Sequence, residues 1–182
     1  MKNTVLRIKA ELENVKKLYC DDDFLWIFNI KDSTSSLTRE NIQFRNTDIL
    51  EIPNSRGTAN FLLKWTEYPK YSTINFVKTK NGCSYDSGAD NDWRDFATFE
   101  CRGYVMGDAF RKLKRNRQSA FNEQIDCAEI ELVEFLPHGN FIVEDIKGKI
   151  YYDVNLSDRN WCDYNQDHEM CVGIYNVEHE IN

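Results

Sequence analysis

The stretch FLWIFNIKDSTS, residues 24–35, decides the fold class. Its apolar side chains fall at alternate positions, with Phe24, Trp26, Phe28 and Ile30 on one face and Leu25 and Ile27 on the other. Such alternation is the period of a β-strand, and apolar residues on both faces predict a strand that is buried on both sides near its start. A polar turn rich in Ser and Thr follows this strand directly.

A second stretch of the same kind, ANFLLKWTEY, occupies residues 59–68 and also ends in a short turn. If the two strand ends meet in space, their turns form one candidate site. Its side chains would come from Asp32, Ser35, Trp65 and Tyr68. None of the four is a thiol, and together they make a poor metal cage. The residues themselves specify no reaction there.

Strand patterns recur along the rest of the chain. Residues 4–15 alternate strictly, which favours a strand over the helix that their Lys, Glu and Leu content would also allow. Further strands are predicted at residues 42–52, 58–65, 71–78, 96–101, 128–135, 141–146, 149–156 and 172–181. About nine or ten short strands between turn signals predict an all-β protein, sandwich- or barrel-like, with little helix. The two parts of the chain look loosely alike, which suggests a pseudo-duplicated architecture.

Three segments lack a strand pattern. Residues 81–92, NGCSYDSGADND, have no apolar pattern and predict a long exposed loop or an internal boundary. Residues 106–124 carry a dense basic run and could form a short helix or a surface loop. Residues 157–169 are acidic and polar around Trp161 and Tyr164.

Composition limits the classes of function. The net charge of −7 argues against a general binder of nucleic acid or of anionic membranes, which need a positive face. We find neither a secretory signal nor an apolar run of the length, roughly 18 residues, that a membrane span needs. The six cysteines contain no CxxC pair, and we interpret them as reduced thiols of a cytoplasmic, soluble monomer.

Four stretches carry a family resemblance. They are LRIKAELENVKKL (6–18), SRGTANFLLK (55–64), FATFECRG (96–103), and VNLSDRNWCDYN with VGIYNVEHEI (154–181). In this order they resemble the eukaryotic CXXC-motif-containing zinc-binding protein family, which has no established reaction. The resemblance spans nearly the whole chain. It implies one compact all-β domain, residues 1–182, of two similar intertwined halves.

The resemblance also implies a metal site that these residues do not reproduce. In the family, two CxxC pairs hold one zinc ion, and the matching positions here are Asp32 with Ser35 and Trp65 with Tyr68. Asp offers one oxygen ligand, Ser almost none, and Trp has no lone pair to give, whereas structural zinc wants four ligands in a tetrahedron. We therefore expect no metal and no cofactor. Aromatic packing of Trp65 and Tyr68 would replace the zinc in tying the turns together.

A second departure from the family is the segment 104–126, which looks like a surface insertion. Its basic residues are Arg111, Lys112, Lys114, Arg115 and Arg117. Such a run is typical of a solvated surface, and the alternative is a local contact with RNA or with an acidic partner.

The remaining motifs give little chemistry. Residues 163–169 resemble the start of a calcium loop but lack its Gly and its closing Glu. Cys101 with a histidine could in principle form a nucleophilic pair, although no local signature supports it. We therefore predict a non-enzymatic protein that acts through contacts with an unknown protein partner. The alternatives are a relocated metal site, for instance Asp32 with a Cys or His from elsewhere, and an undetected hydrolase or thiol enzyme.

Overall fold

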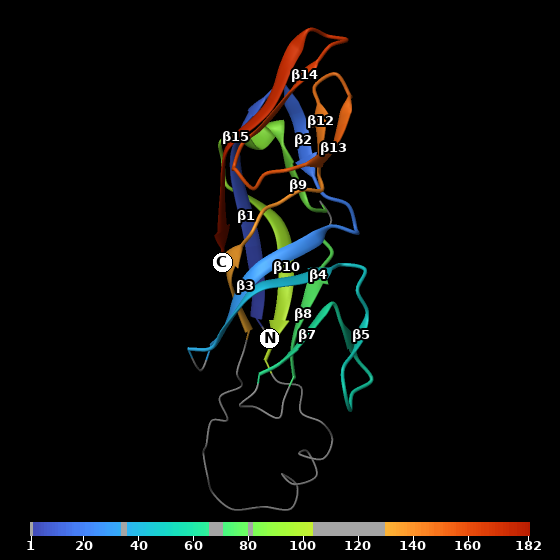
Figure 1. Cartoon of the computed structure of the whole chain (residues 1–182), viewed down its shortest axis with the longest axis vertical. Coiled ribbons are helices and arrows are strands. Elements are labelled where there is room, and N and C mark those ends of the chain that lie inside the picture. Colours follow the sequence, from blue (N-terminus) through green and yellow to red (C-terminus); the bar gives the residue numbers. More distant parts are fainter. Residues whose placement is uncertain (1, 34–35, 66–70, 80–81, 104–129) are drawn as a thin grey trace, which may run out of the picture.

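The computed structural model describes residues 2–33, 36–65, 71–79, 82–103 and 130–182 (Figure 1). In these ranges the chain forms fifteen strands and one short 3₁₀ helix, η1 (Ser87–Ala89). The predicted all-β class with little helix is therefore confirmed. No helix within the same ranges has the length and apolar character that a membrane span requires.

The largest sheet has six antiparallel strands. Their order is β14 (Trp161–Asn165), β15 (Met170–Ile181), β1 (Lys2–Glu13), β10 (Arg94–Arg102), β8 (Tyr71–Val77) and β7 (Phe61–Lys64). The long strands β1 and β15 run along the long axis of the molecule (Figure 1). Alternation in β1 has the predicted effect, because Leu6, Ile8 and Ala10 are buried on one face.

Three smaller sheets accompany the large sheet. One contains β13 (Ile150–Val154), β12 (Phe141–Asp145), β2 (Val15–Tyr19) and β9 (Ser84–Asp86). Another contains β11 (Ile130–Phe135), β3 (Leu25–Asp32) and β4 (Thr38–Arg45), and a two-stranded ladder pairs β5 (Leu50–Glu51) with β6 (Thr58–Ala59). The four-stranded sheet lies in the upper part of Figure 1, and β3 and β4 cross the large sheet below it.

An aromatic core joins the three-stranded sheet to the large sheet. The buried face of β3 presents Trp26 and Phe28, and Phe99 of β10 meets both in edge-to-face contacts with ring centroids 5.1 Å apart. Edge-to-face pairs of this kind each add roughly 0.5–1.5 kcal/mol beyond the burial of their area. The stretch of residues 24–35 therefore determines how the two sheets are joined.

Several predicted boundaries were wrong. The strand predicted over residues 4–15 breaks at Asn14, whose φ of 54° ends β1 and starts β2 in a new direction. The strand predicted over residues 42–52 is two elements, since β4 ends at Arg45 and β5 begins at Leu50. The polar segment 157–169 contains β14, which was not predicted. The predicted insertion 104–126 lies outside the described residues.

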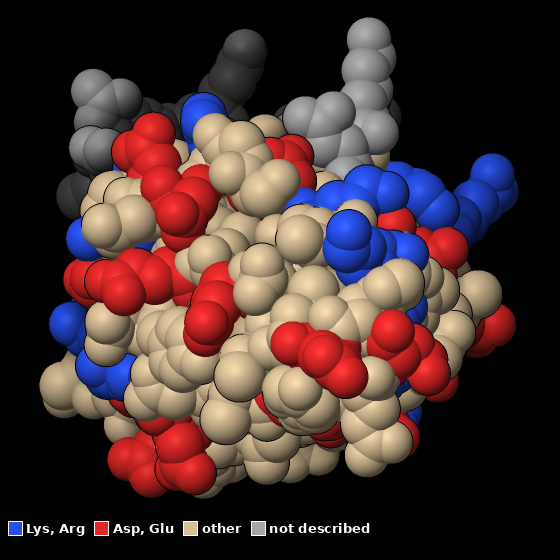
Figure 2. All heavy atoms as spheres, turned by 90° about the horizontal axis from the view of Figure 1, so that it is seen from above, with Lys and Arg blue, Asp and Glu red and all other residues tan. Residues whose placement is uncertain are grey.

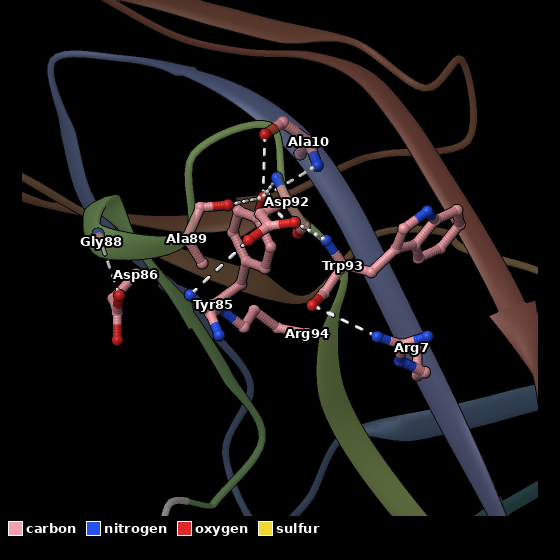
Figure 3. A network of polar contacts seen from close by, with 9 residues as sticks. All are labelled: Arg7, Ala10, Tyr85, Asp86, Gly88, Ala89, Asp92, Trp93 and Arg94. Atoms are coloured by element: carbon pink, nitrogen blue, oxygen red, sulfur yellow. Dashed lines mark hydrogen bonds and ion pairs between the residues drawn. The ribbon is translucent and has the colours of Figure 1, made fainter.

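The largest correction concerns residues 81–92, which are not an exposed loop. Within this segment β9 and η1 fold against β1, and Tyr85 is fully buried (Figure 3). The Tyr85 hydroxyl lies near the carbonyl oxygens of Ala10 (3.0 Å), Asp92 (3.0 Å) and Ala89, and it accepts from the amides of Ala10 and Asp92 at 3.2 Å each. One hydroxyl thus satisfies buried backbone groups both of β1 and of the turn that follows β9.

We predict that Tyr85→Phe lowers the free energy of unfolding by about 1–3 kcal/mol, because it leaves buried backbone groups unpaired. Urea unfolding followed by fluorescence measures this loss. Tyr152→Phe is the control, since Tyr152 is 67 % exposed and should change stability by less than about 0.5 kcal/mol. Equal, small effects of the two variants would contradict the assigned role of Tyr85.

Candidate functional site

Asp32 is the last residue of β3 and is fully buried. Its amide donates to the carbonyl of Leu37 at 2.9 Å, and it stands opposite Ile130 of β11 in the sheet register. Asp32 therefore lies on the central strand of a three-stranded sheet, enclosed from both sides. Its carboxylate is shielded from solvent, which is not the setting of an open catalytic group.

Trp65 follows the last residue of β7 and is only 2 % exposed. The guanidinium of Arg39, from β4, lies 5.9 Å from the centroid of its ring, within the range of a cation–π contact. The indole Nε1 is buried, and no hydrogen-bond partner for it occurs among the described residues. Trp65 belongs to the main hydrophobic core.

Arg39 connects the two strand ends that the sequence placed in one site. It lies on β4, which pairs with the strand that carries Asp32, and it stacks on Trp65 from the other strand end. The structure therefore brings the β3–β4 hairpin against the end of β7. Ser35 and Tyr68, the other two predicted site residues, lie outside the described residues.

The donor atoms at this site do not suit zinc. Asp32 contributes carboxylate oxygens, whereas Trp65 occupies its position with a buried ring that has no ligand atom to offer. Among the residues that the structure describes, no group of three or more His, Cys, Asp or Glu side chains is placed to hold a metal ion. The site as described contains the contact of Arg39 with the buried ring of Trp65, and Asp32 is buried at the end of the strand that pairs with β4.

The weaker candidates also lie in packed surroundings. Cys101 is fully buried in β10. His138 packs against Phe24 with ring centroids 5.5 Å apart, and burial lowers the pKa of this histidine. His179 packs edge-on against Phe135 at 5.7 Å, and burial, with the charge of Arg159, lowers its pKa as well. Both histidines therefore favour the neutral form more strongly than a free histidine does.

A surface hollow that the sequence did not indicate lies between β1, β9 and the start of β10 (Figure 3). It has a volume of about 380 Å³, and Arg7, Trp93 and Arg94 are among its lining residues. Arg7 is already occupied, because its guanidinium bonds Asp95 at 3.1 Å and Glu180 at 2.5 Å. The hollow thus has mixed, largely paired charge. Acidic side chains are also spread over the face of the molecule in Figure 2.

The fold defines this chain as an all-β protein of curled, intertwined antiparallel sheets. A sequence profile described as "CXXC motif containing zinc binding protein, eukaryotic" matches residues 5–112 and 107–182. The chain therefore belongs to this family.

Relatives agree with this assignment. The CXXC motif containing zinc binding protein of Bos taurus is 26 % identical over 179 residues, which cover 97 % of this chain and 95 % of that protein. The UPF0587 protein C2D10.03c of Schizosaccharomyces pombe is also 26 % identical, with the same coverage.

Solved structures share the fold. A hypothetical protein from Plasmodium falciparum matches with a TM-score of 0.83 and 67 % identity, and each chain is covered completely. The crystal structure of C1orf123 matches with a TM-score of 0.77 over 100 % of this chain and 99 % of that chain. At 22 % identity, the second likeness bears on the fold alone.

We predict that Trp65→Ala lowers the free energy of unfolding by about 3–5 kcal/mol, because it removes a fully packed ring and leaves a cavity. Chemical denaturation measures the loss. Trp93→Ala is a matched control: Arg7 lies 5.9 Å from the centroid of its ring, the same separation as for Trp65, but Trp93 is only half-buried. A loss for Trp65→Ala no larger than that for Trp93→Ala would contradict a packing role.

Proposed function

We propose that this chain is a non-enzymatic, cytoplasmic, monomeric member of its family that holds no zinc at the two turns and acts through contacts with another protein. The observation that carries the proposal is the burial of Trp65 beneath Arg39, at a position where the family resemblance implies a cysteine ligand. A ring that fills this position leaves no ligand atom there for zinc.

The energetic argument supports an exchange of metal for packing. Structural zinc contributes apparent binding free energies of about 10–16 kcal/mol in small zinc domains. A buried aromatic ring removes about 150–250 Å² from water, which at about 25 cal/mol per Å² stabilises the fold by roughly 4–6 kcal/mol. Burial of the ring thus offsets part of the free energy that zinc binding would contribute. In a chain of 182 residues with a large aromatic core, the remainder is not needed for folding.

We predict that the purified full-length protein contains far less than one zinc per chain, measured by elemental mass spectrometry after expression with added zinc. The matched comparison is the variant Asp32→Cys, Ser35→Cys, Trp65→Cys and Tyr68→Cys, which restores both ligand pairs and should bind one zinc. Stoichiometric zinc in the unmodified protein would contradict the proposal and favour a relocated site. Failure of a folded four-cysteine variant to bind zinc would show that these are not the ligand positions.

Protein contact is supported by exposed apolar residues on the β12–β13 hairpin. Ile146, Ile150 and Tyr152, here called the hairpin surface, are 51 %, 42 % and 67 % exposed. Strand β13 is at the end of its sheet order, so one of its edges has no neighbouring strand in that sheet. Exposed apolar residues beside such an edge suit an extended partner segment that adds a strand. The exposed Lys147 and Lys149 nearby favour a segment that carries acidic residues.

We predict that Ile150→Glu with Tyr152→Glu abolishes capture of a partner that cross-links to the unmodified protein through this hairpin. The added carboxylates remove apolar contact and repel an acidic segment. Val133→Glu is the control, because Val133 is 56 % exposed on a different strand, β11. The measurement is quantitative mass spectrometry of the captured proteins and of the cross-link positions. Equal loss with the Val133 variant, or no loss with the hairpin variant, would contradict the proposed surface.

A further inference from the structure

Cys20 and Cys83 face one another across two strands. Cys20 follows the last residue of β2, and Cys83 precedes the first residue of β9. The ladder between these strands pairs Tyr19 with Ser84, and one step further Cys20 stands opposite Cys83. The amide of Cys20 donates to the carbonyl of Cys83 at 3.2 Å, so the backbones are still in register at this step.

The two side chains also meet. Both cysteines are free, Cys83 is buried and Cys20 is partly exposed. The Cys83 side chain is near enough to raise the pKa of the Cys20 thiol. Hydrogen-bonded opposite residues of an antiparallel pair have Cα atoms about 5.5 Å apart. Disulfides span Cα separations of about 4.4–6.8 Å. A bond between these two sulfur atoms therefore requires little movement of the backbone.

We propose that Cys20 and Cys83 form a thiol–disulfide site that closes when a low-molecular-weight disulfide, such as oxidised glutathione, oxidises it. Cys20, the more exposed thiol, loses its proton, and its sulfur attacks one sulfur of the glutathione disulfide, which releases one glutathione thiolate. Cys83 then loses its proton, and its sulfur attacks the Cys20 sulfur of the mixed disulfide, which releases the second glutathione thiolate. The two thiolates take up the two protons, so two protein thiols become one disulfide and one glutathione disulfide becomes two glutathione thiols.

The surroundings of Cys20 and Cys83 determine how fast the disulfide forms. Burial raises the pKa of the Cys20 thiol, and the neighbouring Cys83 and the carboxylates of Asp21 and Asp22 raise it further. The attacking species is the thiolate, which is therefore scarce at neutral pH. Oxidation should be slow at pH 7, and its rate should rise about tenfold for each unit by which the pH is raised, as long as the pH stays below the pKa of the thiol.

The bond would close a loop that contains β3 to β8, and with them both Asp32 and Trp65. A cross-link over a loop of this length restricts the unfolded chain strongly. For a chain of this size, the expected rise in melting temperature on oxidation is about 10 °C. This inference does not depend on the proposed function, since it uses only the register of β2 and β9.

Peptide mapping tests the site on the full-length protein. The protein is incubated with excess oxidised glutathione at pH 7 and pH 8, remaining thiols are alkylated, and trypsin is added without reductant. Each cysteine lies alone in its tryptic peptide, Cys20 in residues 18–31 and Cys83 in residues 81–94. We expect these two peptides to be recovered linked, with the link forming about tenfold faster at pH 8.

Variants and melting temperature complete the test. Cys162→Ser with Cys171→Ser, which removes the two thiols that are exposed among the described residues, should leave both the link and the melting shift unchanged. Cys20→Ala and Cys83→Ala should each abolish the shift. Recovery of the two peptides unlinked from the oxidised unmodified protein, or links from Cys20 to other cysteines, would overturn the proposal without any variant having to fold. A linked protein with an unchanged melting temperature would overturn the stabilising effect of the bond.

Discussion

The contact of β3 with β10 is the constraint on which the rest of the fold depends. Among the strands that the structure describes, β3 pairs only with β4 and β11, so its aromatic face joins their sheet to the large one. Trp26 is fixed in this contact at both ends, because its ring packs on Phe99 and its Nε1 donates to Asn46 at 2.8 Å. Alternating aromatic residues thus determine where the polar end of β3 lies.

The character of the candidate site follows from this arrangement. Once β3 is packed on the large sheet, its last residue, Asp32, is buried, and β4 carries Arg39 onto Trp65. In the family resemblance these strand ends carry the two halves of a zinc site. Here the same ends are held by burial and by a cation–π contact, which need no bound ion. Packing of buried side chains therefore holds the ends of β3 and β7 in position.

Which strands could be predicted from the sequence depended on whether apolar residues alternate along the segment. Strands with one strictly apolar face, such as β1 and β3, were predicted because period-two burial is visible in a single sequence. Strand β14 was missed because its three middle residues, 162–164, are all exposed and give no alternation of buried and exposed positions. Strand β9 was missed because its place depends on distant partners: it pairs with β2, and the hydroxyl of Tyr85 bonds Ala10, 75 positions away. The facing of Cys20 and Cys83 likewise needs a strand register that no local pattern encodes.

The segment around β9 shows how a polar stretch can nevertheless be held in place. Strand β9 has only three residues, and its ladder with β2 is correspondingly short. It is anchored by the Tyr85 hydroxyl on one side and by the step from Cys20 to Cys83 on the other. Tyr85 and Cys83 also belong to the main hydrophobic core, and Cys20 packs against it. The ladder of β2 with β9 ends at the step from Cys20 to Cys83, so a covalent bond at this step would hold the end of a short ladder against local opening.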